Sequence, residues 1–209
     1  MSEPDTATLE PPRLSEVLDV AARLFFTKGY RATALAEIGE ALGMNKASLY
    51  YYVRSKEDLL RRLILRAARR LRGASREAEL EGLPALAALE RMVREHCAAI
   101  MEHPYELGLL IQQRRFLDTE TLGEVAEREK AYVARLRAVI ERGIGEGALR
   151  PMDAGVAVQL VLDSVNGLLR WYRPEGRLPR EAVVEEVWRF VCRGLVAEPG
   201  SPTSAARRR

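Results

Sequence analysis

The chain has 209 residues, 47% of them hydrophobic and 30% charged, a balance that excludes an intrinsically disordered protein. Its net charge of +3 is unevenly spread: residues 13–72 hold 13 Lys or Arg against 6 Asp or Glu, and residues 73–197 hold 17 against 20. A basic first third on an acidic remainder is typical of a polyanion-binding module joined to a non-binding body. An Arg-rich solvated helix is the alternative.

The two ends of the chain are expected to be disordered, and the first residues are not expected to form a signal peptide. Residues 1–12, MSEPDTATLEPP, are acidic and predict a disordered arm, because a signal peptide begins with a positive charge and an apolar segment. Residues 197–209 have the composition of a disordered tail. The most apolar stretch, residues 154–169, contains polar residues and is shorter than the roughly 20 residues that span a bilayer. We therefore expect a cytoplasmic protein.

Apolar residues recur with the helical period almost throughout, and no run shows the alternation typical of strands. The sequence therefore predicts an all-α fold of about nine helices. A helix-turn-helix head at residues 13–56 is followed by a helical-bundle domain for ligand binding and dimerisation at residues 57–196. The predicted helices of the second domain, after a long connecting helix that begins near Ser55, span residues 84–102, 105–116, 119–147, 153–172 and 180–196.

The head begins with an apolar stripe at helical spacing from Leu14 to Phe25, which Gly29 ends. Thr33 is then a suitable N-cap for a short helix at residues 34–42. Gly43 can adopt the positive φ of a tight turn, and Asn45 can cap a second short helix at residues 46–52.

This spacing predicts a helix-turn-helix, in which two short helices cross closely over a tight turn. Gly39, four residues before Gly43, is the position for the close approach. Apolar side chains that would lock the second helix in place occur at Leu35, Ile38, Leu42, Leu49 and Val53. A helical hairpin that touches no DNA would satisfy the same pattern, so the decision depends on the exposed side of residues 46–52.

Lys46, Ala47 and Ser48 occupy the first turn of that helix, the part of a recognition helix that reaches base edges. Tyr50 and Tyr51, together with Tyr52, form a run that cannot be wholly buried. Tyrosine rings pack on sugars and their hydroxyls reach phosphate oxygens, which favours DNA. A protein interface remains the alternative.

Two further residues are candidate phosphate contacts. Lys56 is a cation in the first turn of a helix, where it opposes the helix dipole, and a nearby phosphate would explain it. Glu57 and Asp58 offset this local penalty, so Lys56 can also be merely tolerated. Thr33 can serve both as a helix cap and as part of a phosphate anchor at that helix terminus.

Residues 17–60, VLDVAARLFFTKGYRATALAEIGEALGMNKASLYYYVRSKEDLL, resemble the DNA-binding head of the TetR family of regulators. The resemblance rests on the KGY run, Thr33, EIGEALG, SLYYYV and SKEDL at the family's spacing. It implies an all-helical homodimer with two recognition helices in successive major grooves of a palindromic operator. It also implies base-facing positions for Lys46, Ala47 and Ser48, and phosphate-facing positions for Thr33, Tyr50, Tyr51 and Lys56.

The second domain suggests how two copies would associate. The segment 153–172 is apolar nearly all round, so we expect it to be buried against its own core and against a partner subunit. The apolar helix 180–196 would complete a four-helix interface. The interface residues expected from these two helices are Val156, Leu160, Val187, Trp188 and Val191. A core helix of a monomer is the alternative.

Residues 163–179, DSVNGLLRWYRPEGRLP, resemble a stretch of TetR-family members that respond to acyl-CoA or fatty acyl ligands. The resemblance implies a small-molecule effector of this kind, with Arg170, Trp171 and Arg173 meeting its nucleotide end. Arg114 and Asn166 are further candidates for effector binding. Packing of these side chains at the dimer seam, a solvated face for Arg114, and an unrelated apolar effector are the alternatives.

Catalysis is not expected. The only cluster of candidate side chains is Glu95, His96 and Cys97 with Glu102 and His103, and no nucleophile elbow, Gly-rich loop or HExxH motif accompanies it. Cys97 and Cys192 form no CxxC pattern, so neither a disulfide framework nor a zinc site is expected, and no cofactor. The main rival class is a helical protein-interaction module with the tyrosines as its hot spot.

Overall fold

The computed structural model describes residues 11–73 and 80–197, with the side chains of Lys46, Arg72 and Arg114 outside that description. Within it the chain is helical, and an isolated antiparallel bridge joins Leu149 to Val196. The all-α prediction is confirmed. Apart from residues 11, 12 and 197, the predicted arm and tail lie outside the described residues.

The first four helices follow the predicted order closely. They are α1 (Pro12–Leu24), which continues as a π-helical turn at Phe25–Gly29, α2 (Leu35–Ala41), α3 (Lys46–Tyr52) and α4 (Lys56–Gly73). The later helices are α6 (Ala85–Glu102), α7 (Pro104–Gln112), α8 (Thr119–Gly145), α9 (Ala154–Asn166), α10 (Leu168–Trp171) and α11 (Arg180–Leu195).

Two predicted helices are interrupted. The helix expected at 105–116 ends at Gln112, and a 3-10 turn at Arg114–Phe116 follows it. The helix expected at 153–172 is divided at Gly167 into α9 and α10. Glycine is a weak helix former, which explains why the second of these breaks lies at Gly167.

Glycines fix the geometry of the head as predicted. Gly29 and Gly43 have φ of 99° and 62°, a region that other residues adopt only with strain. A Cβ at Gly39 would lie 3.1 Å from the Met44 carbonyl oxygen, so the absence of a side chain lets α2 approach the turn. Ile38, Leu49 and Val53 of the predicted apolar lock are fully buried, and Leu35 and Leu42 pack against the same core.

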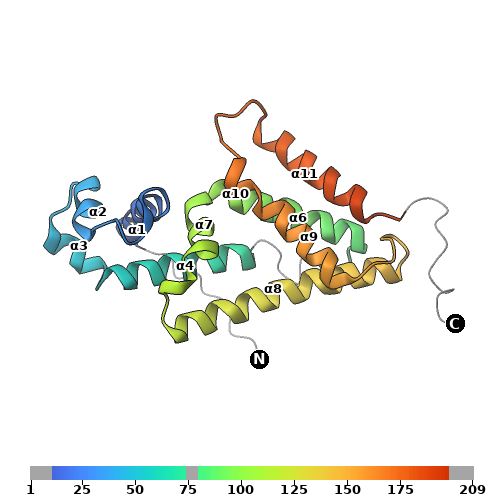
Figure 1. Cartoon of the computed structure of the whole chain (residues 1–209), viewed down its shortest axis with the longest axis horizontal. Helices are drawn as coiled ribbons and strands as arrows, with labels where there is room; N and C mark the ends of the chain where they lie inside the picture. The colour runs from blue at the N-terminus through green and yellow to red at the C-terminus, as the bar shows by residue number, and fades with distance from the viewer. Residues whose placement is uncertain (1–10, 74–79, 198–209) are drawn as a thin grey trace.

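The molecule is elongated, with the head at one end (Figure 1). Helix α4 runs from the head into the body, where it packs against α7 and α8, while α1 packs on its head-proximal part. In the body, α6 lies among α8, α9 and α11. The division at residue 56 remains a prediction, because α4 contacts both parts.

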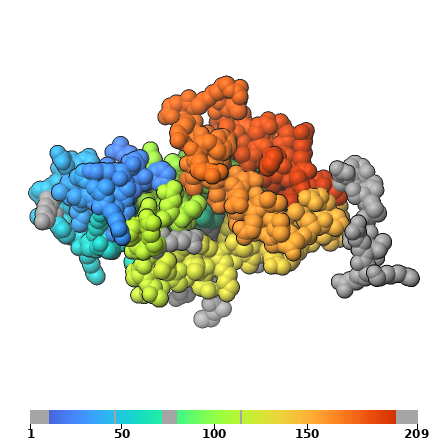
Figure 2. All heavy atoms as spheres, in the orientation of Figure 1, coloured from blue at the N-terminus to red at the C-terminus, as the bar shows by residue number. Residues whose placement is uncertain are grey.

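The space-filling view shows the segment between α10 and α11 projecting from the body (Figure 2). Across the described ranges, no helix is both long and apolar enough to cross a membrane. No three His, Cys, Asp or Glu side chains in those ranges are grouped as metal ligands.

Candidate nucleic-acid interface

Helix α3 is held by one capping bond and by a buried side. The Asn45 Oδ1 accepts a hydrogen bond of 2.8 Å from the Ser48 backbone N–H, which confirms Asn45 as the predicted cap. Leu49 is 1% exposed and anchors the helix in the core. Ala47 is exposed and Ser48 half-buried on the outer side. The side chain of Lys46 lies outside the described part of the chain.

The three tyrosines of α3 have different exposures. Tyr51 is 85% exposed and Tyr50 45%, whereas Tyr52 is half-buried and packs against the core. The Tyr51 and Tyr52 rings meet edge to face with centroids 5.2 Å apart. Tyr52 therefore supports the ring of Tyr51, and only Tyr50 and Tyr51 offer large accessible aromatic surfaces.

Arg13, which the sequence reasoning missed, lies beside this surface. An open hollow next to the turn is lined by Arg13 of α1 together with Ala47, Ser48 and Tyr51 of α3. The guanidinium donates to the Leu42 carbonyl oxygen at 3.2 Å and pairs with Glu16. No sequence motif marks this cation, because only the crossing of α1 over the turn brings it near α3.

The predicted role of Thr33 as a helix cap is wrong. The N-cap of α2 is Ala34, whose N–H donates to the Glu37 carboxylate at 2.7 Å. Thr33 is 1% exposed, and its hydroxyl donates to the carbonyl oxygens of Gly29 at 2.9 Å and of Leu24 at 3.3 Å. Because this hydroxyl closes the end of the preceding helix, its side chain is not available to a phosphate in this conformation.

Lys56 has partners within the protein. Its ammonium donates to the Arg31 carbonyl oxygen at 3.2 Å and lies 4.5 Å from the centroid of the Tyr30 ring. Burial, with a smaller effect of Glu57, raises the pKa of Tyr30 to about 12, so this ring stays a neutral phenol. These contacts explain why a lysine is stable at this helix start even without DNA. The contact of Lys56 with a phosphate stays a prediction.

The head and the body each match a family model. Residues 17–63 match "Bacterial regulatory proteins, tetR family", and residues 82–195 match "Tetracyclin repressor-like, C-terminal domain". The second match alone spans more than half of the chain. The chain belongs to the TetR family. It is therefore a DNA-binding transcriptional regulator, with α2 and α3 as its helix-turn-helix.

Several known proteins are similar over most of their length. The HTH-type transcriptional repressor KstR2 of Rhodococcus jostii is 28% identical over 187 residues, 88% of this chain and 92% of that protein. The TetR family regulator PfmR from Thermus thermophilus has 32% identity and a TM-score of 0.77, covering 85% of this chain and 97% of that one. AibR in complex with isovaleryl coenzyme A and operator DNA has 25% identity and a TM-score of 0.75, covering 85% and 97%.

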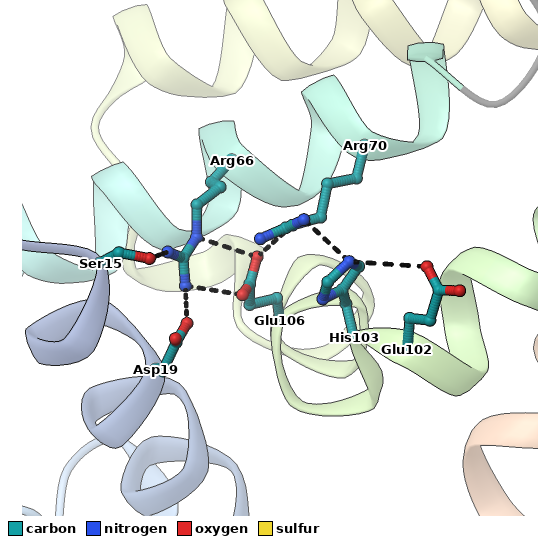
Figure 3. A network of polar contacts seen from close by, with 7 residues as sticks. All are labelled: Ser15, Asp19, Arg66, Arg70, Glu102, His103 and Glu106. Atoms are coloured by element: carbon teal, nitrogen blue, oxygen red, sulfur yellow. Dashed lines mark hydrogen bonds and ion pairs between the residues drawn. The ribbon is translucent and has the colours of Figure 1, made fainter. Parts of the chain in front are cut away.

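In this TetR-family protein, a buried ion-pair network joins the head to the body (Figure 3). The Arg66 Nε and Nη2 of α4 donate to both oxygens of Glu106 of α7, at 3.1 and 2.6 Å. The same guanidinium donates to Asp19 at 2.5 Å and to Ser15 at 3.3 Å, both on α1. Arg66 and Glu106 are 5% and 4% exposed. Each therefore needs the opposite charge of the other to offset the cost of its removal from water.

The network continues towards the far side of the body. Arg70 donates to Glu106 at 3.1 Å and to His103 Nε2 at 2.8 Å. Burial and the charge of Arg70 lower the pKa of His103. Glu102, next in the chain, accepts a hydrogen bond of 2.6 Å from Arg180 at the start of α11. Charged side chains thus connect α1, α4, α7, α6 and α11.

A second approach between head and body is apolar. A Cβ on Gly108 of α7 would lie 2.1 Å from the Phe26 ring, so any larger residue would require that ring or one of the two helices to shift. Tyr105 of the same helix meets Phe26 with ring centroids 5.7 Å apart. Both contacts fix α7 against the π-helical turn that follows α1.

The cluster of candidate catalytic side chains is divided between the core and the network. His96 is buried, its Nδ1 is 3.0 Å from the Tyr132 hydroxyl, and burial lowers its pKa to about 4. Burial raises the pKa of the Cys97 thiol to about 12, so this sulfur is not a thiolate at neutral pH. His103 belongs to the network, seven residues from His96.

The residues predicted to bind an effector lie in different environments. Arg170, Trp171 and Arg173 lie at α10 and just beyond it, with Trp171 55% exposed. Asn166 instead lies beside the buried His96, where its side chain opposes the lowering of the imidazole pKa. Arg114 has its backbone in the 3-10 turn after α7, and its side chain lies outside the described part.

Two of the predicted dimer residues are already buried within the single chain. Trp188 and Val191 of α11 are only 7% and 5% exposed. Val156 and Leu160 of α9 are each 54% exposed, and Val187 is half-buried. Phe190, which belongs to the same predicted interface helix, is 73% exposed. Helix α11 is amphipathic as expected, but Trp188 and Val191 lie on the side that faces the core of the chain and Phe190 lies on the side that faces solvent.

The network generates a stability prediction. Glu106→Gln removes the negative charge that both Arg66 and Arg70 share, so we expect a loss of about 3–5 kcal/mol in the free energy of unfolding. Glu141→Gln, in an exposed pair with Arg137, is the matched control and is expected to change it by less than about 1 kcal/mol. Denaturant unfolding checks this, and equal losses for the two variants would contradict the assigned role.

Proposed function

We propose that the protein is a repressor that binds a palindromic operator as a homodimer and is released by a small-molecule effector. The observation that carries the proposal is the outer side of α3, where Ala47 and Tyr51 are exposed while Leu49 holds the helix rigidly in the core. The similarity to KstR2, a protein named as a repressor, supports the direction of regulation.

In the proposed complex, Lys46, Ala47 and Ser48 face base edges in the major groove, and Tyr50 and Tyr51 contact the sugar-phosphate backbone. Arg13 adds a cation beside the same surface. One donor of the Lys56 ammonium is used by Arg31, which leaves two for a phosphate.

We expect Tyr51→Phe, which removes only a hydroxyl, to weaken operator binding about tenfold. This corresponds to about 1.4 kcal/mol for one lost hydrogen bond to a phosphate, and the loss should be the same on any DNA sequence. Ser48→Ala should instead alter the preference at one base pair of each half-site. Tyr105→Phe, an exposed tyrosine of α7, is the control.

Selection of bound duplexes from a random pool, followed by titration at several salt concentrations, measures these effects. A palindrome among the winners and a steep loss of affinity with salt are the expected results. Binding to no duplex, or an affinity unaffected by salt, would favour the alternative, a protein-interaction module with the tyrosines as its hot spot.

The exposed apolar side chains of α9 and α11 support the homodimer. Val156, Leu160 and Phe190 present large apolar side chains to solvent in the single chain, and Val187 lies half-buried in α11. Burying such side chains contributes about 1.5–3 kcal/mol each. The proposed four-helix interface therefore uses these residues, and not the buried Trp188 and Val191.

Phe190→Glu should convert the dimer into a folded monomer, because it places a charge in the proposed interface while leaving the core intact. Sedimentation gives the mass, and circular dichroism checks that the variant stays helical. Arg189→Glu, an adjacent exposed position, is the control expected to remain dimeric. A dimeric Phe190→Glu variant would contradict the proposed interface.

For the effector, we propose an acyl-CoA or fatty acid. The support is the neighbour AibR, whose structure contains isovaleryl coenzyme A, together with the exposed Trp171 between Arg170 and Arg173. A planar ring and guanidinium groups suit a nucleotide base and phosphates. Binding would favour a body conformation in which the two heads are spaced wrongly for one turn of DNA.

We expect acyl-CoAs to release wild-type protein from its operator, and Trp171→Ala to need about tenfold more acyl-CoA through the loss of one stacking contact. Operator affinity without effector should stay unchanged, which separates effector binding from DNA binding. Identical operator affinities with and without every acyl-CoA tested would exclude this class in favour of an unrelated apolar effector.

A further inference from the structure

A buried polar centre joins three helices of the body. His96 of α6 meets the hydroxyl of Tyr132 of α8 at 3.0 Å, and the side chain of Asn166 at the end of α9 lies beside its imidazole. His96 and Tyr132 are only 4% and 7% exposed. Burial keeps the imidazole neutral at physiological pH by lowering its pKa. These groups lie in a body whose buried side chains are mostly apolar.

Two arginines accompany this centre on the same side of α8. Arg128 precedes Tyr132 by four residues and Arg135 follows it by three, spacings that place all three side chains on one helix face. Burial raises the pKa of Tyr132, and the positive charge of Arg135 acts on it in the opposite direction, which indicates that the guanidinium is close to the phenol.

Both arginines have unused donors. Within the part of the chain that the structure describes, Nε and Nη2 of Arg135 are buried and have no hydrogen-bond partner. Arg128 donates from Nη2 to Glu124 at 2.6 Å, but its Nη1 is likewise buried without a partner. A buried cationic donor without a partner is costly, and native proteins rarely keep one.

Arg66 of the same protein shows how the Nε and Nη2 atoms of a guanidinium, which form one edge of the group, are paired when they are buried. Its Nε and Nη2 donate side by side to the two oxygens of Glu106. Arg135 presents the same pair of atoms without a hydrogen-bond partner among the described residues. An ordered water would accept these hydrogen bonds without offsetting the charge, whereas an oxyanion does both.

We propose that the Nε and Nη2 edge of Arg135 binds an oxyanion of the effector, a carboxylate or a phosphate, with Arg128 and Tyr132 as its neighbours on α8. This inference rests on the proposed function, because it takes the protein to be effector-responsive. It assigns the anionic group of the effector to the interior of the body, in addition to the exposed surface around Trp171. A neutral apolar effector would leave the edge unpaired.

The test compares Arg135→Gln and Arg135→Lys with wild type. Gln removes the charge, and Lys keeps the charge but not the paired donors. Arg137→Gln is the matched control, an exposed arginine of α8 in a pair with Glu141. Each protein is titrated with octanoate, coenzyme A and inorganic phosphate at millimolar concentrations, with the shift in melting temperature as the readout.

We expect at least one probe to raise the melting temperature of wild type and of Arg137→Gln. The same probe should bind at least about tenfold more weakly to both Arg135 variants, because each variant loses a charge-assisted hydrogen bond. A response to octanoate identifies a carboxylate, and a response to coenzyme A or phosphate identifies a phosphate. The proposal is overturned if no probe binds wild type, or if the Arg135 variants respond as wild type does.

Operator binding without any probe is measured on the same proteins. Wild type and all three variants should bind the operator equally, which shows that the variants are folded and that Arg135 does not act on DNA. If wild type binds no operator, the proposed function fails, while the melting-temperature shifts still report on the oxyanion site.

Discussion

The bidentate pair between Arg66 and Glu106 is the contact on which the rest of the structure depends. Both groups are nearly inaccessible, and removing charges from water costs several kcal/mol unless they are paired. Arg66 also holds Asp19 of α1, so a different placement of the head would leave a buried cation with fewer partners. The close approach of Gly108 to Phe26 adds a steric constraint at the same junction. Charge and shape therefore select the same orientation of α1 on α4 and α7.

This junction lies between the surfaces that the proposed function requires. The head presents α3 to DNA, α9 and α11 present exposed apolar side chains to a second copy, and the body holds the buried centre around His96 and Tyr132. Polar contacts run from Asp19 of the head through Arg66, Glu106 and Arg70 to His103, and the neighbouring Glu102 pairs with Arg180 in the first turn of α11. An effector that favours one arrangement of α6 and α7 would act directly on the contacts that hold the head.

Arginines with buried guanidinium nitrogens serve two purposes in this molecule. Arg66 is matched by carboxylates of the same chain, which makes it part of the fold. Arg135 is half-buried, and its Nε and Nη2 are buried without a hydrogen-bond partner among the described residues, which makes it a candidate for a ligand. Both lie on apolar faces of helices, where the sequence gives no sign of which arginine will meet a carboxylate. The distinction depends on Glu106, 40 residues from Arg66 along the chain.

The sequence by itself determined the all-α class, the boundaries of most helices within a few residues, and the helix-turn-helix with Gly39, Gly43 and Asn45 in their roles. These features are local, since they depend on helical period, capping bonds and backbone conformation within a few residues. Tertiary packing decided the rest. It buried the Thr33 hydroxyl against Gly29, placed Trp188 inside and Phe190 outside, supported Tyr51 on Tyr52, and brought Arg13 beside α3. Each of these outcomes depends on which helix packs against which, a relation between distant residues that a periodic pattern does not contain.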